Sequence, residues 1–219
     1  MSAARLLDLG ARPYREVWAL QRQLHEAVAA GREPDTWIVV EHGPVVTLGR
    51  QARRENLLLS PEAFARRGVD VVDVERGGDV TYHGPGQLVV YPIRRLARFR
   101  EVVPLVRSLE GAVIACCGRF GIAGERWGEH AGVWVGEDQI CAIGLAVKRM
   151  VSMHGLALNV STSLDYDRLI NPCGLTGRGI TSISAQSGRP VSLEETKRVL
   201  LEELAREFEV SFYAESQVA

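Results

Sequence analysis

The sequence predicts an α+β fold, in which a mixed β-sheet has helices packed on one side. Short runs of β-branched and aromatic residues follow one another without regular alternation of strand and helix, which favours a mixed sheet. Apolar residues recur at helical spacing in three longer segments, and glycine- and proline-rich stretches separate the periodic runs. The 219 residues suffice for one domain over residues 1–219, either alone or with a small C-terminal portion over residues 180–219.

The first half of the chain is predicted to begin with a strand over residues 6–9. A helix follows from Pro13, where a first turn tolerates proline, to Gly31. Two strands over residues 36–41 and 45–48 then surround a His-Gly-Pro turn. Ser60 and Pro61 open a short helix that ends at Gly68.

The second half is predicted to add strands, two long helices and a hairpin. Apolar runs at residues 69–74 and 87–91 are typical of strands, and residues 102–120 carry one apolar stripe of a helix. The remaining elements are a hairpin (131–135 and 139–147), a strand (151–160), a helix from Ser192 to about residue 208 and an edge strand (210–213). Residues 161–191 carry no periodic pattern and are expected to be irregular.

Composition excludes several classes of function. The net charge of −1 and the lack of a basic cluster argue against a nucleic-acid partner. No apolar run is long enough to span a membrane, and the N-terminus lacks the pattern of a signal peptide. Four cysteines without CxxC spacing predict a reduced chain in the cytoplasm. Cys116 and Cys117 fall on the apolar stripe of a helix, so we expect both in the core.

The stretch RGGDVTYHGPGQ at residues 76–87 is the most informative part of the chain. Its four glycines allow the backbone to approach a ligand closely, and its Arg, Thr, Tyr and His side chains supply hydrogen-bonding groups. A hairpin turn needs only about two such residues. The composition therefore predicts a binding loop between two strands.

Three side chains are candidates for chemistry. Cys173 lies in a segment without periodicity, where it is either an accessible nucleophile or a small buried turn residue. His83 and His154 are candidate bases or orienting groups, although each also fits a structural role. A zinc site formed by these three residues is conceivable, but their spacing matches no compact ligand pattern, so we expect no metal.

Six motifs in order resemble those of the lipoyl(octanoyl) transferases. They are EHGPVVTLGR at residues 41–50, RGGDVTYHGPGQLVVYP at 76–92, GVWV at 132–135, CAIG at 141–144, SMHGLALN at 152–159 and INPCG at 170–174. Together they span residues 40–180. The resemblance implies a fold similar to the catalytic domain of lipoate and biotin protein ligases, a mixed sheet with flanking helices.

The resemblance also implies a reaction. An octanoyl group would pass from octanoyl-acyl carrier protein to Cys173 as a thioester. It would then pass to a lysine of a lipoyl domain, in a 2-oxoacid dehydrogenase or the glycine cleavage H protein. No cofactor would be needed, because the donor thioester is already activated. The residues implied for the acyl site are Arg76, Gly77, Gly78, Asp79, Val80, Thr81, Tyr82, His83, Ala142, Ile143, Gly144, Gly155, Leu156 and Ala157.

Gln139 departs from the family pattern. The resemblance implies a lysine here, two residues before the CAIG motif, which would lower the pKa of the catalytic cysteine. Three explanations stay open: the alignment is shifted, the lysine is lost in a natural or engineered chain, or His83 or His154 carries the role of base. We favour a substitution at the aligned position.

Two rival functions follow from these residues. One is an ATP-dependent lipoate-protein ligase, which needs a lysine near the adenylate and has only Lys148 and Lys197 to choose from. The other is a weakly active module that binds an acylated carrier protein, because Gln139 replaces the expected lysine.

Overall fold

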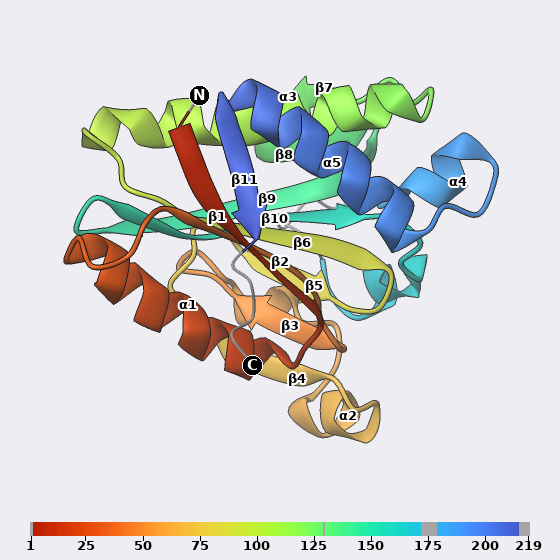
Figure 1. Ribbon diagram of the computed structural model, residues 1–219. Coiled ribbons are helices and arrows are strands. Elements are labelled where there is room, and N and C mark those ends of the chain that lie inside the picture. The colour runs from red at the N-terminus through yellow and green to blue at the C-terminus, as the bar shows by residue number, and fades with distance from the viewer. Residues whose placement is uncertain (1, 129, 172–178, 215–219) are drawn as a thin grey trace.

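A computed structural model of the chain describes residues 2–128, 130–171 and 179–214. Its centre is an eight-stranded sheet in the order β11-β1-β2-β6-β10-β9-β8-β7 (Figure 1). The strands are β1 (Ser2–Ala11), β2 (Thr36–Glu41), β6 (Gln87–Ile93), β7 (Glu125–Trp127), β8 (His130–Val135), β9 (Asp138–Lys148), β10 (Val151–Asn159) and β11 (Val210–Ala214). β1 pairs in parallel with β2 and β11, whereas the other neighbours are antiparallel. The predicted mixed sheet is confirmed.

Helices cover both faces of this sheet, so the prediction of helices on one side was wrong. On one face, α3 (Val102–Arg119) and α5 (Leu193–Glu207) pack over Trp37 and Val39 of β2. On the other face, α1 (Tyr14–Ala29) packs over Ile38 and Val40 of the same strand (Figure 1). Successive strand residues point to opposite faces, and a strand that is apolar at every position needs a cover on each.

A second sheet with the order β4-β3-β5 lies on the α1 side of the first (Figure 1). Its strands are β3 (Val45–Leu48), β4 (Asp70–Asp73) and β5 (Val80–His83), and α2 (Pro61–Arg66) joins β3 to β4 after a 3-10 turn at Arg54–Asn56. β5 corrects the predicted loop at residues 76–87. Residues 80–83 of that stretch form a strand, because they pair antiparallel with β3 in the small sheet.

The C-terminal residues complete the large sheet and its helical cover. β11 is the predicted edge strand and pairs with β1. Ser192 caps α5, since its hydroxyl accepts a hydrogen bond from the Glu195 backbone N–H. In the stretch predicted to be irregular, two short elements were missed, a 3-10 helix at Leu164–Arg168 and α4 (Ile183–Ser187). Strand β7 and a 3-10 turn at Phe99–Glu101 before α3 were also not predicted. Within the described ranges, none of the helices has the length and apolar character needed to cross a bilayer.

Candidate functional site

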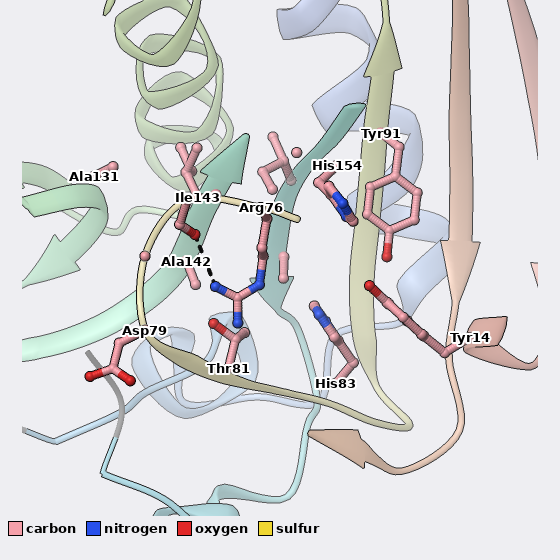
Figure 2. Close-up of a pocket in the computed structure, with 16 residues that line it drawn as sticks. Tyr14, Arg76, Asp79, Thr81, His83, Tyr91, Ala131, Ala142, Ile143 and His154 are labelled. Atoms are coloured by element: carbon pink, nitrogen blue, oxygen red, sulfur yellow. Dashed lines mark hydrogen bonds between the residues drawn. The ribbon is translucent and has the colours of Figure 1, made fainter. Parts of the chain in front are cut away.

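Where the two sheets meet, a pocket opens between the glycine-rich segment and four strands of the large sheet, β6, β8, β9 and β10 (Figure 2). Residues 76–79 and the side chains of Thr81 and His83 form one wall. β9 and β10 form the opposite wall, mostly with small or apolar side chains. The lining is completed by Tyr14, Tyr91, Ala131, Ala142, Ile143, Gly144, His154, Gly155, Leu156 and Ala157. The pocket is thus apolar with a few convergent polar groups, as is typical of a ligand site.

Arg76 fixes the glycine-rich wall in place. Its guanidinium is buried and donates hydrogen bonds to the Thr47 carbonyl at 2.7 Å and to the Thr47 hydroxyl at 2.9 and 3.1 Å. It also donates to the carbonyl of Gly77 at 3.0 Å, drawn dashed in Figure 2. The next N–H, that of Gly77, donates to the Leu145 carbonyl of β9 at 2.8 Å. The segment therefore joins the small sheet to the large one.

Two glycines on β9 and β10 permit this close packing. A Cβ at Gly144 would lie 3.0 Å from the Gly77 carbonyl oxygen, so a side chain there would push the glycine-rich wall away. A Cβ at Gly155 would lie 2.1 Å from the carbonyl oxygen of Val90 on β6. β9 and β10 are both held in the sheet by ladder hydrogen bonds, so neither strand can shift to make space for a side chain at these positions.

A chain of buried amide groups sets the protonation of His83. The side-chain amide of Gln87 donates from Nε2 to the Tyr82 carbonyl and to Asn159 Oδ1, so its Oε1 faces His83 Nδ1 at 2.8 Å. Nδ1 must therefore carry a proton and donate it, which leaves Nε2 as the unprotonated nitrogen. Burial first, then the neighbouring His42, lowers the pKa of His83 to about 3. His83 is neutral at physiological pH.

His42 and Tyr91 form a second buried pair beside it. His42 Nδ1 lies 2.9 Å from the Arg12 carbonyl and donates to it, so Nε2 accepts from the Tyr91 hydroxyl at 2.9 Å. Burial lowers the pKa of His42 to about 4 and raises the pKa of Tyr91. Tyr14 stacks on His83 with ring centroids 5.8 Å apart (Figure 2).

His154 occupies a strained position on β10. Its φ of 57° lies in the left-handed region, which a residue with a side chain seldom adopts. The strain is held by a hydrogen bond from the His154 N–H to Oε1 of Gln21 in α1. The imidazole Nε2 lies 3.6 Å from the Glu75 carboxylate. Burial lowers the pKa of His154 despite this carboxylate, and the imidazole is neutral.

A smaller pocket lies behind the first and contains Gln139. Val80 and Tyr82 point into it rather than into the main pocket, because alternate residues of β5 face opposite ways. Thr81, Ala142 and Ala157 line both pockets, which are therefore adjacent. Gln139 is only 6% exposed, and its Nε2 has no hydrogen-bond partner within the described part of the chain. Buried amide groups are usually hydrogen-bonded, so this unpaired donor is unusual.

The cysteines divide into two groups. Cys116, Cys117 and Cys141 are free and buried, and burial raises the pKa of each, that of Cys117 to about 12. The core prediction for Cys116 and Cys117 is confirmed. Cys173, the candidate nucleophile, lies outside the described residues.

Sequence reasoning missed Tyr14, Tyr91 and Ala131 among the lining residues of the main pocket. Tyr91 follows the glycine-rich motif on a predicted strand, but every residue of that strand is buried, so no alternation marks Tyr91 as a lining residue. Tyr14 gave no signal either, because it begins α1 and is distant in the sequence from the other residues of the pocket.

Comparison with known proteins decides the family. The model of the lipoyl protein ligase A/B catalytic domain matches residues 13–205. The chain belongs to this family. Among its relatives is a protein of Syntrophobacter fumaroxidans named octanoyltransferase, 49% identical over 93% of this chain and 90% of that protein. A protein of the same name from Koribacter versatilis is 43% identical over 89% of this chain and 80% of its own length.

A solved protein of low sequence identity shares the fold. A crystal structure of lipoate-protein ligase A bound with ATP superposes with a TM-score of 0.80 over 99% of this chain and 90% of the other, at 17% identity. This confirms the predicted α+β architecture.

Proposed function

We propose that the chain is an octanoyltransferase of lipoate biosynthesis. It takes an octanoyl group from octanoyl-acyl carrier protein and transfers it to a lysine of a lipoyl domain, in a 2-oxoacid dehydrogenase or the glycine cleavage H protein. The observation that carries the proposal is the gathering of the glycine-rich, CAIG and HGLA segments around one largely apolar pocket. The names of relatives up to 49% identical support the same activity.

Cys173 is the nucleophile of this proposal. A thiol attacks as its thiolate, and the buried Cys116, Cys117 and Cys141 have raised pKa values that keep them protonated. Cys173 is the fourth and last cysteine of the sequence. That the other three are free thiols also fits a protein of the reducing cytoplasm.

The described flanks of the Cys173 segment support this role. On one side, Ile170 bridges to Leu57 and lines the smaller pocket together with Gln139. On the other, the carbonyl of Gly179 accepts a hydrogen bond from the Gln139 N–H at 3.0 Å, and Thr181 donates back to the Gln139 carbonyl at 2.9 Å. Both ends of the segment therefore start from the pocket that holds Gln139.

The reaction runs in two balanced steps. The Cys173 thiolate attacks the thioester carbonyl of the donor; a new C–S bond forms, the old one breaks, and the carrier's thiolate leaves and takes a proton. The neutral amine of the acceptor lysine then attacks the enzyme thioester. A C–N bond forms and the C–S bond to Cys173 breaks; the amine loses a proton and the Cys173 thiolate takes one up, which regenerates the thiol. The first step exchanges one thioester for another, and no ATP is consumed.

Gln139 offers a hydrogen-bond donor at the position where the octanoyltransferase pattern has a charged lysine. Its amide N–H, which has no partner among the described residues, has a proton to donate to a thiolate, but no positive charge to lower the pKa of that thiol. His83 and His154 do not replace the charge, because both are neutral. None of these three residues therefore supplies a charge that would favour the thiolate over the thiol.

The positions of the lysines argue against an ATP-dependent ligase. Lys148 lies at the end of β9 and borders a different cavity with Arg22 and Glu75. Lys197 lies on α5 and pairs with Asp8 and Glu194. Neither lines the main pocket or the pocket of Gln139.

The test is acylation followed by mass spectrometry. Incubation of the full chain with octanoyl-acyl carrier protein should add one octanoyl group, mapped to Cys173 by peptide sequencing, and Cys173→Ala should abolish it. The Gln139→Lys variant should form the adduct faster at neutral pH and move the midpoint of its pH–rate profile to lower pH.

Other outcomes would contradict the proposal. An adduct on Cys116, Cys117 or Cys141 would overturn the choice of nucleophile. Carrier binding without transfer, rescued by Gln139→Lys, would identify a weakly active module. Transfer that requires ATP and free octanoate would identify a ligase.

A further inference from the structure

An exposed apolar pair lies at the start of α3. Phe99 is 70% exposed and Val103, one helical turn later, is 66% exposed, more than any other large apolar side chain in the described ranges. Phe99 is flanked in the sequence by two exposed arginines, Arg98 and Arg100. Scattered apolar residues are ordinary on a protein surface, whereas an adjacent pair rimmed by charge is typical of an interaction site. These four residues are called the α3 entrance patch.

The two arginines of the patch have no side-chain partner in the described part of the chain. The segment from Arg94 to Arg107 carries five arginines and one acidic residue, Glu101. Three of the arginines are engaged, with the carbonyls of α1, with Asp35 and with Glu110. Glu101 accepts from the Ala97 N–H. Arg98 and Arg100 make neither a side-chain hydrogen bond nor an ion pair with any described residue, so the patch presents uncompensated positive charge.

A groove runs beside the start of α3, next in sequence to this patch, and adjoins the main pocket. Val102 and Val106, on the inner side of the same helix, line it together with Leu145 of β9. Its volume is about 830 Å³, and it shares six lining residues with the pocket: Gly77, Gly78, Asp79, Ala131, Ile143 and Gly144. A ligand chain that enters beside α3 therefore reaches the pocket without leaving the protein surface.

We propose that the α3 entrance patch docks the protein that carries the acyl donor, an acidic surface with an apolar centre, whose acylated arm lies in the groove. This inference rests on the proposed octanoyl transfer. Carboxylates of the carrier pair with Arg98 and Arg100, and its apolar centre covers Phe99 and Val103. Complementary charge at the rim of such an interface chiefly speeds association and fixes orientation.

The groove favours the donor over the acceptor as the occupant. A carrier protein presents its acyl group at the end of a long flexible arm, which needs an extended channel between the docking patch and the pocket. An acceptor lysine lies at the end of a four-carbon stem, so its domain must dock directly over the reacting atoms. The groove therefore suits the long arm of the donor protein better than the short lysine side chain of the acceptor.

The experiment compares two donors with the full chain. Octanoyl-acyl carrier protein and the small thioester octanoyl-pantetheine are each assayed with the wild type, with Arg98→Glu/Arg100→Glu and with Phe99→Ala. For the double variant we expect KM for the carrier-bound donor to rise about tenfold, with weaker dependence on salt. KM and kcat for octanoyl-pantetheine should stay within a factor of two, which also shows that the variants fold.

The matched control is Arg66→Glu. Arg66 is an exposed arginine of α2 without a described partner, at the opposite end of the molecule from the start of α3 (Figure 1). It should leave both donors unaffected.

An unchanged KM for the carrier donor in Arg98→Glu/Arg100→Glu would overturn the docking surface while leaving the transfer activity standing. A raised KM for the lipoyl domain instead would assign the patch to the acceptor and overturn the choice of occupant. Failure of the wild type to use either donor would refute the proposed function itself.

Discussion

Asn159 ties the candidate site together, and its replacement by aspartate is a sharp test of the hydrogen-bond network. Its Nδ2 donates to the Thr181 carbonyl and to the Tyr166 hydroxyl, both at 3.0 Å, while its Oδ1 accepts from Gln87. Tyr166 and Thr181 stand on the two sides of the segment that contains Cys173. One buried amide thus holds both flanks of the segment.

The Asn159→Asp substitution keeps the shape of the side chain but replaces the Nδ2 donor with an oxygen. The hydroxyl of Tyr166 rotates to donate and Gln87 still donates, but the new carboxylate oxygen faces the Thr181 carbonyl at the former 3.0 Å. The carbonyl is left unsatisfied beside a buried charge, which costs at least about 1–3 kcal/mol. The alternative is to protonate the aspartate, whose O–H then restores the donation to Thr181.

Protonation sets the upper limit of the destabilisation. An unfolded aspartate has a pKa of about 3.9, and each pH unit above it adds about 1.4 kcal/mol to the cost of holding the proton. The deficit relative to the wild type is therefore at most about 5 kcal/mol at pH 7.5 and about 2 kcal/mol at pH 5.5. The folded-state pKa of this aspartate is raised, so the variant regains stability as the pH falls.

Urea unfolding at pH 5.5 and 7.5 measures both quantities. The expected result is a deficit for Asn159→Asp that is larger at pH 7.5, together with faster amide hydrogen exchange at residues 166–171 and 179–181. The control Gln23→Glu makes the same amide-to-carboxylate change at an exposed position of α1 and should stay within about 0.5 kcal/mol. A pH-independent deficit, or none, would refute the assignment of the donor to Nδ2.

Two other variants test the packing and the electrostatics of the site. Gly155→Ala places a Cβ 2.1 Å from the Val90 carbonyl oxygen and should cost at least about 1–3 kcal/mol in urea unfolding. By contrast Gly118→Ala, in an open position of α3, should stabilise by about 0.5–1 kcal/mol; equal effects would contradict the steric argument. The pKa of His42 is lowered to about 4 and that of His83 to about 3, so the unfolded chain binds more protons below about pH 6.5. Stability should therefore fall as the pH drops from 6.5 towards 4, and His42→Asn should reduce the slope by about 1.4 kcal/mol per pH unit. An unchanged slope would show that His42 is charged in the folded state.

Much of the fold was predictable because it rests on local periodicity. The two strands around residues 42–44, α1, α3 and the cap of α5 at Ser192 all lie close to the residues that the pattern indicated. β5 was not predictable, since a four-residue strand flanked by glycines has too little alternation to distinguish it from a loop. The face of the sheet that α1 covers could not be predicted either. An apolar stripe shows that a helix is buried, but not against which face of a sheet it packs.

The sequence by itself determined the class of fold, the motif segments of the site and the departure at Gln139, because each is written in consecutive residues. Only the tertiary structure decided the protonation of His83, the burial of the Gln139 amide, and which residues of β5 face which pocket. Those properties depend on partners distant in the chain: Gln87 and Asn159 are 72 residues apart and meet only when β6 and β10 pair. Local pattern carries propensity, whereas burial and hydrogen bonding are fixed by contacts that form once the strands are in register.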